Sequence, residues 1–64
     1  MNAAQFRRAR RRLGFSVEQM ALSLRVTAQT VWRWEHGRTR VPGPAVELVS
    51  RLLIDKHEAA TPAA

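Results

Sequence analysis

Gln29 and Arg33 are the side chains in this sequence whose types and spacing suit chemical recognition. A glutamine amide can form two hydrogen bonds with adenine, and an arginine guanidinium can donate two to guanine. The two residues are four positions apart, so they share one face if the segment is a helix. The same residues would also be ordinary on a solvated surface. Their types and spacing alone leave the binding partner open, and it depends on the elements that hold these side chains.

Catalytic and metal-binding chemistry has no comparable set of residues. The chain has no cysteine, which excludes disulfides and argues against zinc fingers and thiol redox motifs. The two histidines, His36 and His57, are too few and too far apart to form a metal site. Ser16 and Thr27 are explained as helix caps, and no hydroxyl or carboxylate stands in a nucleophile–base arrangement. We therefore expect no enzymatic activity, no metal and no cofactor.

The charge is concentrated in the first two thirds of the chain. Eleven basic and five acidic residues give a net charge of +6, and ten of the basic residues are arginine. Residues 1–40 hold nine basic and two acidic side chains, whereas residues 41–64 hold two and three. Such a positive field is expected of a nucleic-acid binder, although an acidic protein or a membrane surface would also fit it.

Apolar spacing and capping residues predict the elements that carry these charges. Asn2 with Gln5 and Ser16 with Gln19 have the spacing of capping boxes, and Thr27 can cap a further helix. The predicted helices span about 3–13, 17–24, 28–36 and 44–56. Their inward residues include Phe6, Ala9, Leu13, Val17, Met20, Ala21, Leu24, Val31, Trp34, Ala45, Leu48, Val49, Leu52 and Leu53.

The length of 64 residues allows at most one domain. We assign residues 1–56 to a compact all-α domain of four helices, or of five. Residues 57–64 have no apolar periodicity and are expected to form a flexible tail. No apolar run is long enough to span a bilayer, and five arginines lie within 7–12 where a signal peptide would need apolar residues. We therefore expect a cytoplasmic protein.

The predicted second and third helices, joined by a short turn, form a helix-turn-helix. The run SVEQMALSLRVTAQTVWRWEHG at 16–37, followed by Pro42 and an apolar helix, resembles the phage-repressor and Cro-like helix-turn-helix family, also called the XRE family. The resemblance covers about residues 3–54. It implies a lambda-repressor-like all-α fold whose third helix, within 27–36, enters the major groove of DNA.

The resemblance also implies roles for individual residues. Arg10 and Glu35 resemble the ion pair that joins the first helix to the end of the recognition helix in that family. Base contacts would come from Ala28, Gln29, Trp32 and Arg33. Phosphate contacts would come from Ser16, Arg25, Thr27, Thr30, Arg38 and Arg40.

The sequence departs from the family pattern at three positions. Arg25 stands where the turn usually has glycine, so it is strained if its backbone is left-handed, unless a phosphate contact offsets that strain. Val17 replaces a glutamine that often contacts phosphate. Trp32 is a large apolar residue at an outward position that is usually polar. It could contact a thymine methyl or a sugar, take part in self-association, or pack partly on its own domain.

The apolar stripe of the predicted fourth helix is wider than three helices can cover. Val46, Leu53 and Ile54 would stay in contact with water in a monomer, and an exposed apolar patch often marks an interface. A symmetric dimer through this helix would separate two recognition helices by about 34 Å, one turn of DNA. We therefore expect a bacterial or phage-encoded homodimeric repressor that reads a palindromic operator in double-stranded DNA, without a small-molecule ligand or a membrane partner.

Three other functions remain open from the sequence. The chain could be a protein-interaction module, similar to an antitoxin or a phage adaptor, that binds an acidic partner through Trp32 and Leu22. It could bind nucleic acid, including RNA, without reading sequence, although the mixed surface of Ala28, Gln29 and Arg33 argues mildly against this. Membrane association is the weakest alternative because the apolar face of the first helix is narrow.

Overall fold

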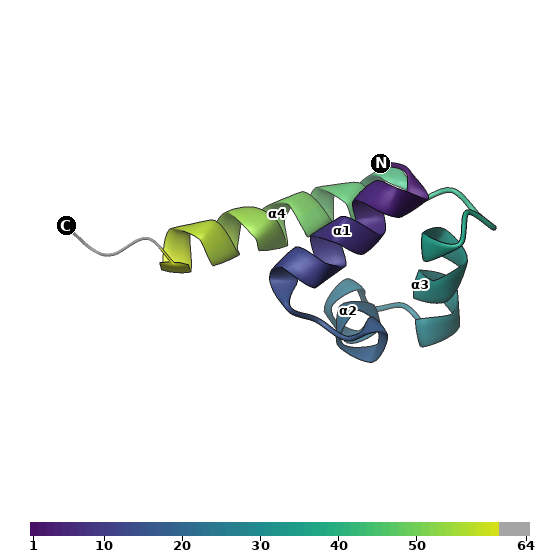
Figure 1. The fold of residues 1–64 in the computed structure, drawn as a ribbon, viewed down its shortest axis with the longest axis horizontal. Coiled ribbons are helices and arrows are strands. Elements are labelled where there is room, and N and C mark those ends of the chain that lie inside the picture. Colours follow the sequence, from purple (N-terminus) through teal and green to yellow (C-terminus); the bar gives the residue numbers. More distant parts are fainter. Residues whose placement is uncertain (61–64) are drawn as a thin grey trace.

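The computed structural model describes residues 1–60 of the chain. It contains four helices in this part: α1 (Ala3–Leu13), α2 (Val17–Leu24), α3 (Ala28–Glu35) and α4 (Gly43–Ala60). Helices α1 and α4 lie side by side, and α2 and α3 pack beneath α1 at one end of the molecule (Figure 1). The C-terminal half of α4 projects beyond the other helices (Figure 1). The predicted all-α fold of four helices is confirmed.

The helix starts are fixed by local hydrogen bonds that the sequence predicts. The capping boxes of α1 and α2 are both complete. The side chain of Asn2 or Ser16 accepts a hydrogen bond from the backbone N–H of the glutamine three residues later, and the side chain of that glutamine accepts one from the backbone N–H of the cap residue. Each box satisfies two backbone N–H groups that a helix start would otherwise leave without partners. Gly14 ends α1 with a φ of 74°, a left-handed conformation that glycine adopts without strain.

The core lies where α1, α2 and α3 meet the first half of α4. Phe6 and Trp34 form its aromatic centre, with ring centroids 5.5 Å apart and an edge-to-face angle of 77°. This geometry is favoured by the aromatic quadrupoles. The buried apolar residues are Phe6, Ala9, Leu13, Met20, Ala21, Leu24, Val31, Trp34, Val41, Ala45 and Val49.

Helix α4 differs from the prediction at both ends and on one face. It runs from Gly43 to Ala60, so the predicted helix end at 56 is wrong and the helix continues into the segment predicted as a tail; residues 61–64 of that segment lie outside the described part. Glutamate and alanine are strong helix formers, which continue the helix without an apolar stripe. Leu48, predicted to face inward, is 48% exposed because the short helices cover only part of the stripe.

Candidate nucleic-acid interface

The turn between α2 and α3 is built around Arg25. The backbone of Arg25 is left-handed, with φ 58° and ψ 43°, and it is the only residue other than glycine with positive φ in the described chain. The N–H of Arg25 bonds the carbonyl of Leu22 (3.2 Å), and the N–H of Val26 bonds that of Ala21 (3.0 Å). These two bonds define a Schellman cap with arginine at the position that glycine normally occupies.

Helix α3 presents one face to the core and the other to solvent. Val31, Trp34 and Glu35 are buried. Gln29, Trp32, Arg33 and His36 are exposed and form the outward face of α3. Thr27 caps the helix: its Oγ1 accepts the N–H of Thr30 (3.2 Å) and lies 2.9 Å from the Thr30 hydroxyl. The helix ends at Glu35, one residue earlier than predicted.

The predicted base-contact residues therefore differ in how far they are exposed to solvent. Gln29 and Arg33 are exposed on the outward face, and Trp32 is 44% exposed there. Ala28 is half-buried and packs against the core, which leaves it a smaller accessible surface. His36 received no role from the sequence, although it lies four residues, about one turn, after Trp32.

Trp32 is in contact with two side chains of its own domain. Its indole stacks on the His36 imidazole, with centroids 4.0 Å apart and an interplanar angle of 18°. The Cζ atom of Arg38 lies over the Trp32 ring, 5.8 Å from the centroid. We call these three residues the Trp32 stack. Packing on its own domain was one of three alternatives for Trp32, and it leaves much of the indole accessible.

The end of α3 is tied to α1 by a buried carboxylate. Glu35 is 4% exposed, and its Oε2 accepts a 2.7 Å bond from Arg10 Nε while its Oε1 accepts one of 3.1 Å from Arg10 Nη2. Arg10 also donates to the carbonyl of Phe15 (2.9 Å). This bidentate pair joins α3 to α1 and occupies the Arg10 guanidinium.

Arg7 was not assigned to this ion pair from the sequence. Its Nη2 donates to the backbone carbonyl of Glu35 (2.7 Å), and its Nε lies 3.8 Å from the Glu35 carboxylate. Arg7 therefore joins α1 to the end of α3 together with Arg10. Arg7 precedes Arg10 by three residues, nearly one turn, and that spacing is the signal that could have revealed the contact.

The predicted phosphate-contact residues lie mainly on exposed loops and helix starts. Ser16, Arg25, Thr27, Arg38 and Arg40 are exposed, and Thr30 is half-buried. Among the described residues no carboxylate pairs with Arg25, Arg33, Arg38 or Arg40. Their positive charges are therefore not neutralised within the domain, and they are available to a polyanion.

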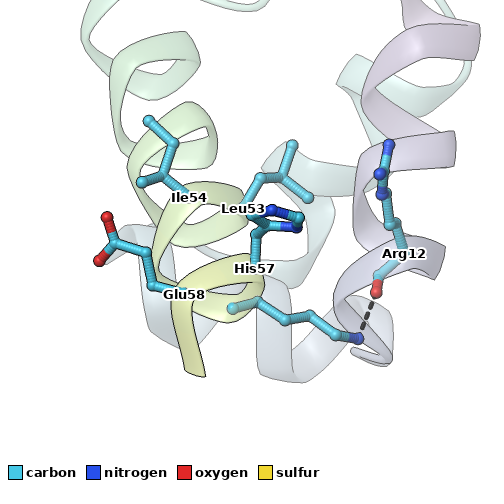
Figure 2. Close-up of a pocket in the computed structure, with 6 residues that line it drawn as sticks. Arg12, Leu53, Ile54, His57 and Glu58 are labelled. Atoms are coloured by element: carbon cyan, nitrogen blue, oxygen red, sulfur yellow. Dashed lines mark hydrogen bonds between the residues drawn. The ribbon is translucent and has the colours of Figure 1, made fainter. Parts of the chain in front are cut away.

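A separate groove of about 410 Å³ lies between the C-terminal ends of α1 and α4. Figure 2 shows Arg12 of α1 across from Leu53 and His57 of α4, with Ile54 on the outer side of α4. Lys56 also lines the groove, and its ammonium group donates a hydrogen bond to the carbonyl of Arg12. Of the predicted dimer residues, Ile54 is 51% exposed, whereas Val46 and Leu53 are half-buried against the core.

The described part of the chain contains no group of three or more histidine, cysteine, aspartate or glutamate side chains that could hold a metal ion. None of its helices is both long enough and apolar enough to cross a bilayer.

The paired helices, the capped turn and the polar outward face of α3 define a helix-turn-helix. The family model described as "Helix-turn-helix domain" matches residues 3–53. The chain belongs to this family, which confirms the resemblance seen in the sequence, and DNA binding is the function that the family supports. Neither a curated protein nor a solved structure gives a significant match to the chain.

Proposed function

We propose that this protein is a sequence-specific transcriptional repressor that binds double-stranded DNA as a homodimer, with α3 in the major groove. The observation that carries the proposal is the outward face of α3, which combines Gln29 and Arg33 with unpaired cationic side chains around it. An α-helix fits the major groove, where glutamine can bind adenine and arginine can bind guanine. The proposal includes no catalysis, metal or cofactor.

The proposed interface makes two kinds of contact with DNA, to base edges and to phosphates. Gln29, Trp32 and Arg33, with Ala28 at the helix start, read base edges. The hydroxyls and arginines around α3 hold phosphates and set the register without reading sequence. These phosphate-binding residues are Ser16, Arg25, Thr27, Thr30, Arg38 and Arg40.

Self-association is proposed to occur through one flank of α4. Leu53 and Ile54 line the groove between α1 and α4, and Val46 lies on the same flank of the helix. A two-fold dimer would present two copies of α3 to half-sites about one turn of DNA apart and explain a palindromic operator. A repressor of this kind blocks a promoter by occupying it. A bacterial or phage origin and a cytoplasmic site of action belong to the same proposal.

Enrichment of random-sequence duplexes by the purified protein tests the proposal. At about 150 mM salt, where nonspecific binding is weakened, we expect an inverted repeat with half-sites one helical turn apart. Recovery of random sequence by a folded protein would overturn sequence-specific recognition.

The enriched duplex then separates base contacts from phosphate contacts. Arg33→Ala should weaken binding by roughly 1–3 kcal/mol and relax the preference at one base pair. Arg40→Ala should weaken all duplexes alike and reduce the salt slope by about 1. Equal losses on specific and random DNA for both variants would contradict this division.

A second candidate function is binding to an acidic protein partner. Leu22 favours it, because this large apolar side chain is 79% exposed on α2. The cationic edge of the α1–α4 groove, formed by Arg12 and Lys56, would suit such a partner. A protein complex that persists after substitution of both Gln29 and Arg33, but not of Leu22, would favour this function over DNA reading.

A further inference from the structure

The Trp32 stack places a large apolar surface at the edge of a polar face. Trp32 lies on the outward side of α3, at about 100° per residue on the opposite side of Gln29 from Arg33, and keeps 44% of its surface exposed. The core does not need it, because Trp34 and Phe6 already fill the aromatic centre. Much of the indole is therefore accessible to a partner outside the domain.

His36 fixes the indole from one side. Its imidazole stacks on the Trp32 ring at 4.0 Å, and its Nδ1 lies 2.8 Å from the Trp32 carbonyl oxygen. A carbonyl oxygen can only accept, so Nδ1 carries the proton in this bond. The imidazole is thus held through both its ring and its edge, and it limits the rotamers that Trp32 can adopt.

Arg38 adds a cation over the same ring, with Cζ 5.8 Å from the centroid. The contact lies within the range at which a guanidinium is attracted to an aromatic face. Trp32 is consequently ordered before any ligand arrives. A side chain that is already ordered loses less conformational entropy on binding than a free one does.

We infer that the Trp32 stack contacts the 5-methyl group of a thymine in the major groove, and that His36 and Arg38 are positioning residues for this contact. Among the groups that base pairs present in the major groove, the thymine methyl is the apolar one. The hydrogen-bonding edges suit Gln29 and Arg33 instead. This inference rests on the proposed function, and it adds a particular base and two positioning residues to it.

Replacement of thymine by deoxyuridine tests the inference, because it removes the methyl group and leaves base pairing unchanged. Each thymine of the enriched duplex is replaced singly, and the Kd is measured by fluorescence anisotropy at constant salt. We expect one position in each half-site to lose about four-fold in affinity, which corresponds to ~0.8 kcal/mol for one buried methyl group.

Variants of the stack identify the residues responsible. Trp32→Ala and His36→Ala should each reduce the thymine-to-deoxyuridine ratio toward one. Arg38→Ala should lower this ratio, and Arg38→Lys should restore it, because lysine keeps a cation over the ring. Arg40→Ala is the matched control: it should weaken both duplexes and leave their ratio unchanged. Far-ultraviolet circular dichroism of each variant checks that the helices are intact.

The possible outcomes separate this inference from the proposed function. If no sequence is enriched, both fall together. If a sequence is enriched but no single deoxyuridine replacement weakens wild-type binding, the thymine contact is wrong and the proposed function stands. If the thymine-to-deoxyuridine affinity ratio is unchanged in both His36→Ala and Arg38→Ala, the thymine contact stands and only the positioning roles of His36 and Arg38 are wrong.

Discussion

The Glu35 side chain is the buried charge on which the orientation of α3 depends. Glu35 is the only polar or charged residue that is buried in the described part of the chain. It accepts two hydrogen bonds from Arg10, and Arg7 binds both its carboxylate and its backbone carbonyl. A buried charge is tolerated only when its hydrogen bonds are satisfied, as they are here.

Glu35→Gln should therefore destabilise the domain strongly. The substitution removes the partner of Arg10, whose side chain is only 16% exposed, and leaves that guanidinium charge poorly compensated. We expect a loss of about 3 kcal/mol in the free energy of unfolding, measured by urea denaturation at pH 7. Asp55→Asn is the matched control, because the Arg51–Asp55 pair is exposed and should contribute under about 1 kcal/mol. Equal losses for the two variants would contradict the structural role of Glu35.

Arg25→Gly should stabilise the domain while it weakens DNA binding. The left-handed backbone of Arg25 strains any residue with a Cβ by about 1–2 kcal/mol, and glycine relieves that strain. Glycine also has greater conformational freedom in the unfolded chain, which offsets part of this stabilisation. The free energy of unfolding, measured by urea denaturation, should therefore increase by about 0.5–1 kcal/mol.

Arg25→Ala separates the two effects of that substitution. Alanine keeps the Cβ strain and removes the charge, so it should give no gain in stability. Both variants should reduce the salt slope of DNA binding by about 1 if Arg25 contacts a phosphate. An Arg25→Gly variant that is no more stable than Arg25→Ala would show that the turn is not strained.

Residue contacts were predictable from sequence where they are local. The capping boxes of Asn2 and Ser16 follow from three-residue spacing, and the structure confirms both. The Arg10–Glu35 contact joins residues 25 positions apart, and it was accessible only through the family resemblance. Arg7 and His36 were missed although each lies one turn from a residue already singled out, because spacing alone does not say which neighbours touch.

At the scale of the element, α3 depends on its first turn. With eight residues, α3 is too short to be stable in isolation, so its cap and its packing on the core must hold it. Thr27→Ala removes the side chain that accepts from the Thr30 N–H and should lower the free energy of unfolding by about 1 kcal/mol. Thr27→Ser keeps the hydroxyl and should retain most of this stability. Thermal denaturation of the two variants checks the difference, and a similar loss in both would rule out the cap.

The apolar stripe of α4 predicts that the helix exists, but neither where it ends nor which side chains are covered. The stripe identified the helix but not its C-terminal end, because residues 57–60 (HEAA) add no large apolar residue to it. The bond from Lys56 to the Arg12 carbonyl and the exposed Arg51–Asp55 pair at 3.8 Å support the turns that precede this end. The stripe also could not show that Leu48 stays exposed, because coverage depends on how far the neighbouring helices reach.

At the scale of the whole molecule, the two candidate interfaces are separate. Helix α3 lies at one end of the molecule, and the C-terminal part of α4 projects away from it (Figure 1). The groove is lined by α4 residues from Leu53 to Glu58, so it lies toward the projecting end of α4. Binding of a second copy at the groove would therefore leave α3 free for DNA. The first interface contains Arg25, Arg33, Arg38 and Arg40, which pair with no carboxylate among the described residues, and the exposed apolar side chain of Ile54 belongs to the second.

The two exposed apolar side chains of α4 allow a matched test of the dimer. Ile54 and Leu48 are 51% and 48% exposed, and at about 100° per residue they lie on different flanks of the helix. Ile54→Glu should abolish self-association and the cooperative binding of an inverted repeat, while the affinity for a single half-site is retained. Leu48→Glu introduces the same charge on the other flank and should behave as the wild type.

Sedimentation of each protein, free and on the enriched duplex, provides the measurement. The wild type should place two chains of 7.3 kDa on each inverted repeat, and Ile54→Glu should fill the two half-sites independently. The same loss in both variants would mean that charge on α4, rather than the Ile54 flank, controls assembly. A wild type that is monomeric both free and on DNA would remove the dimer from the proposed function, because two copies of α3 would then have no fixed spacing.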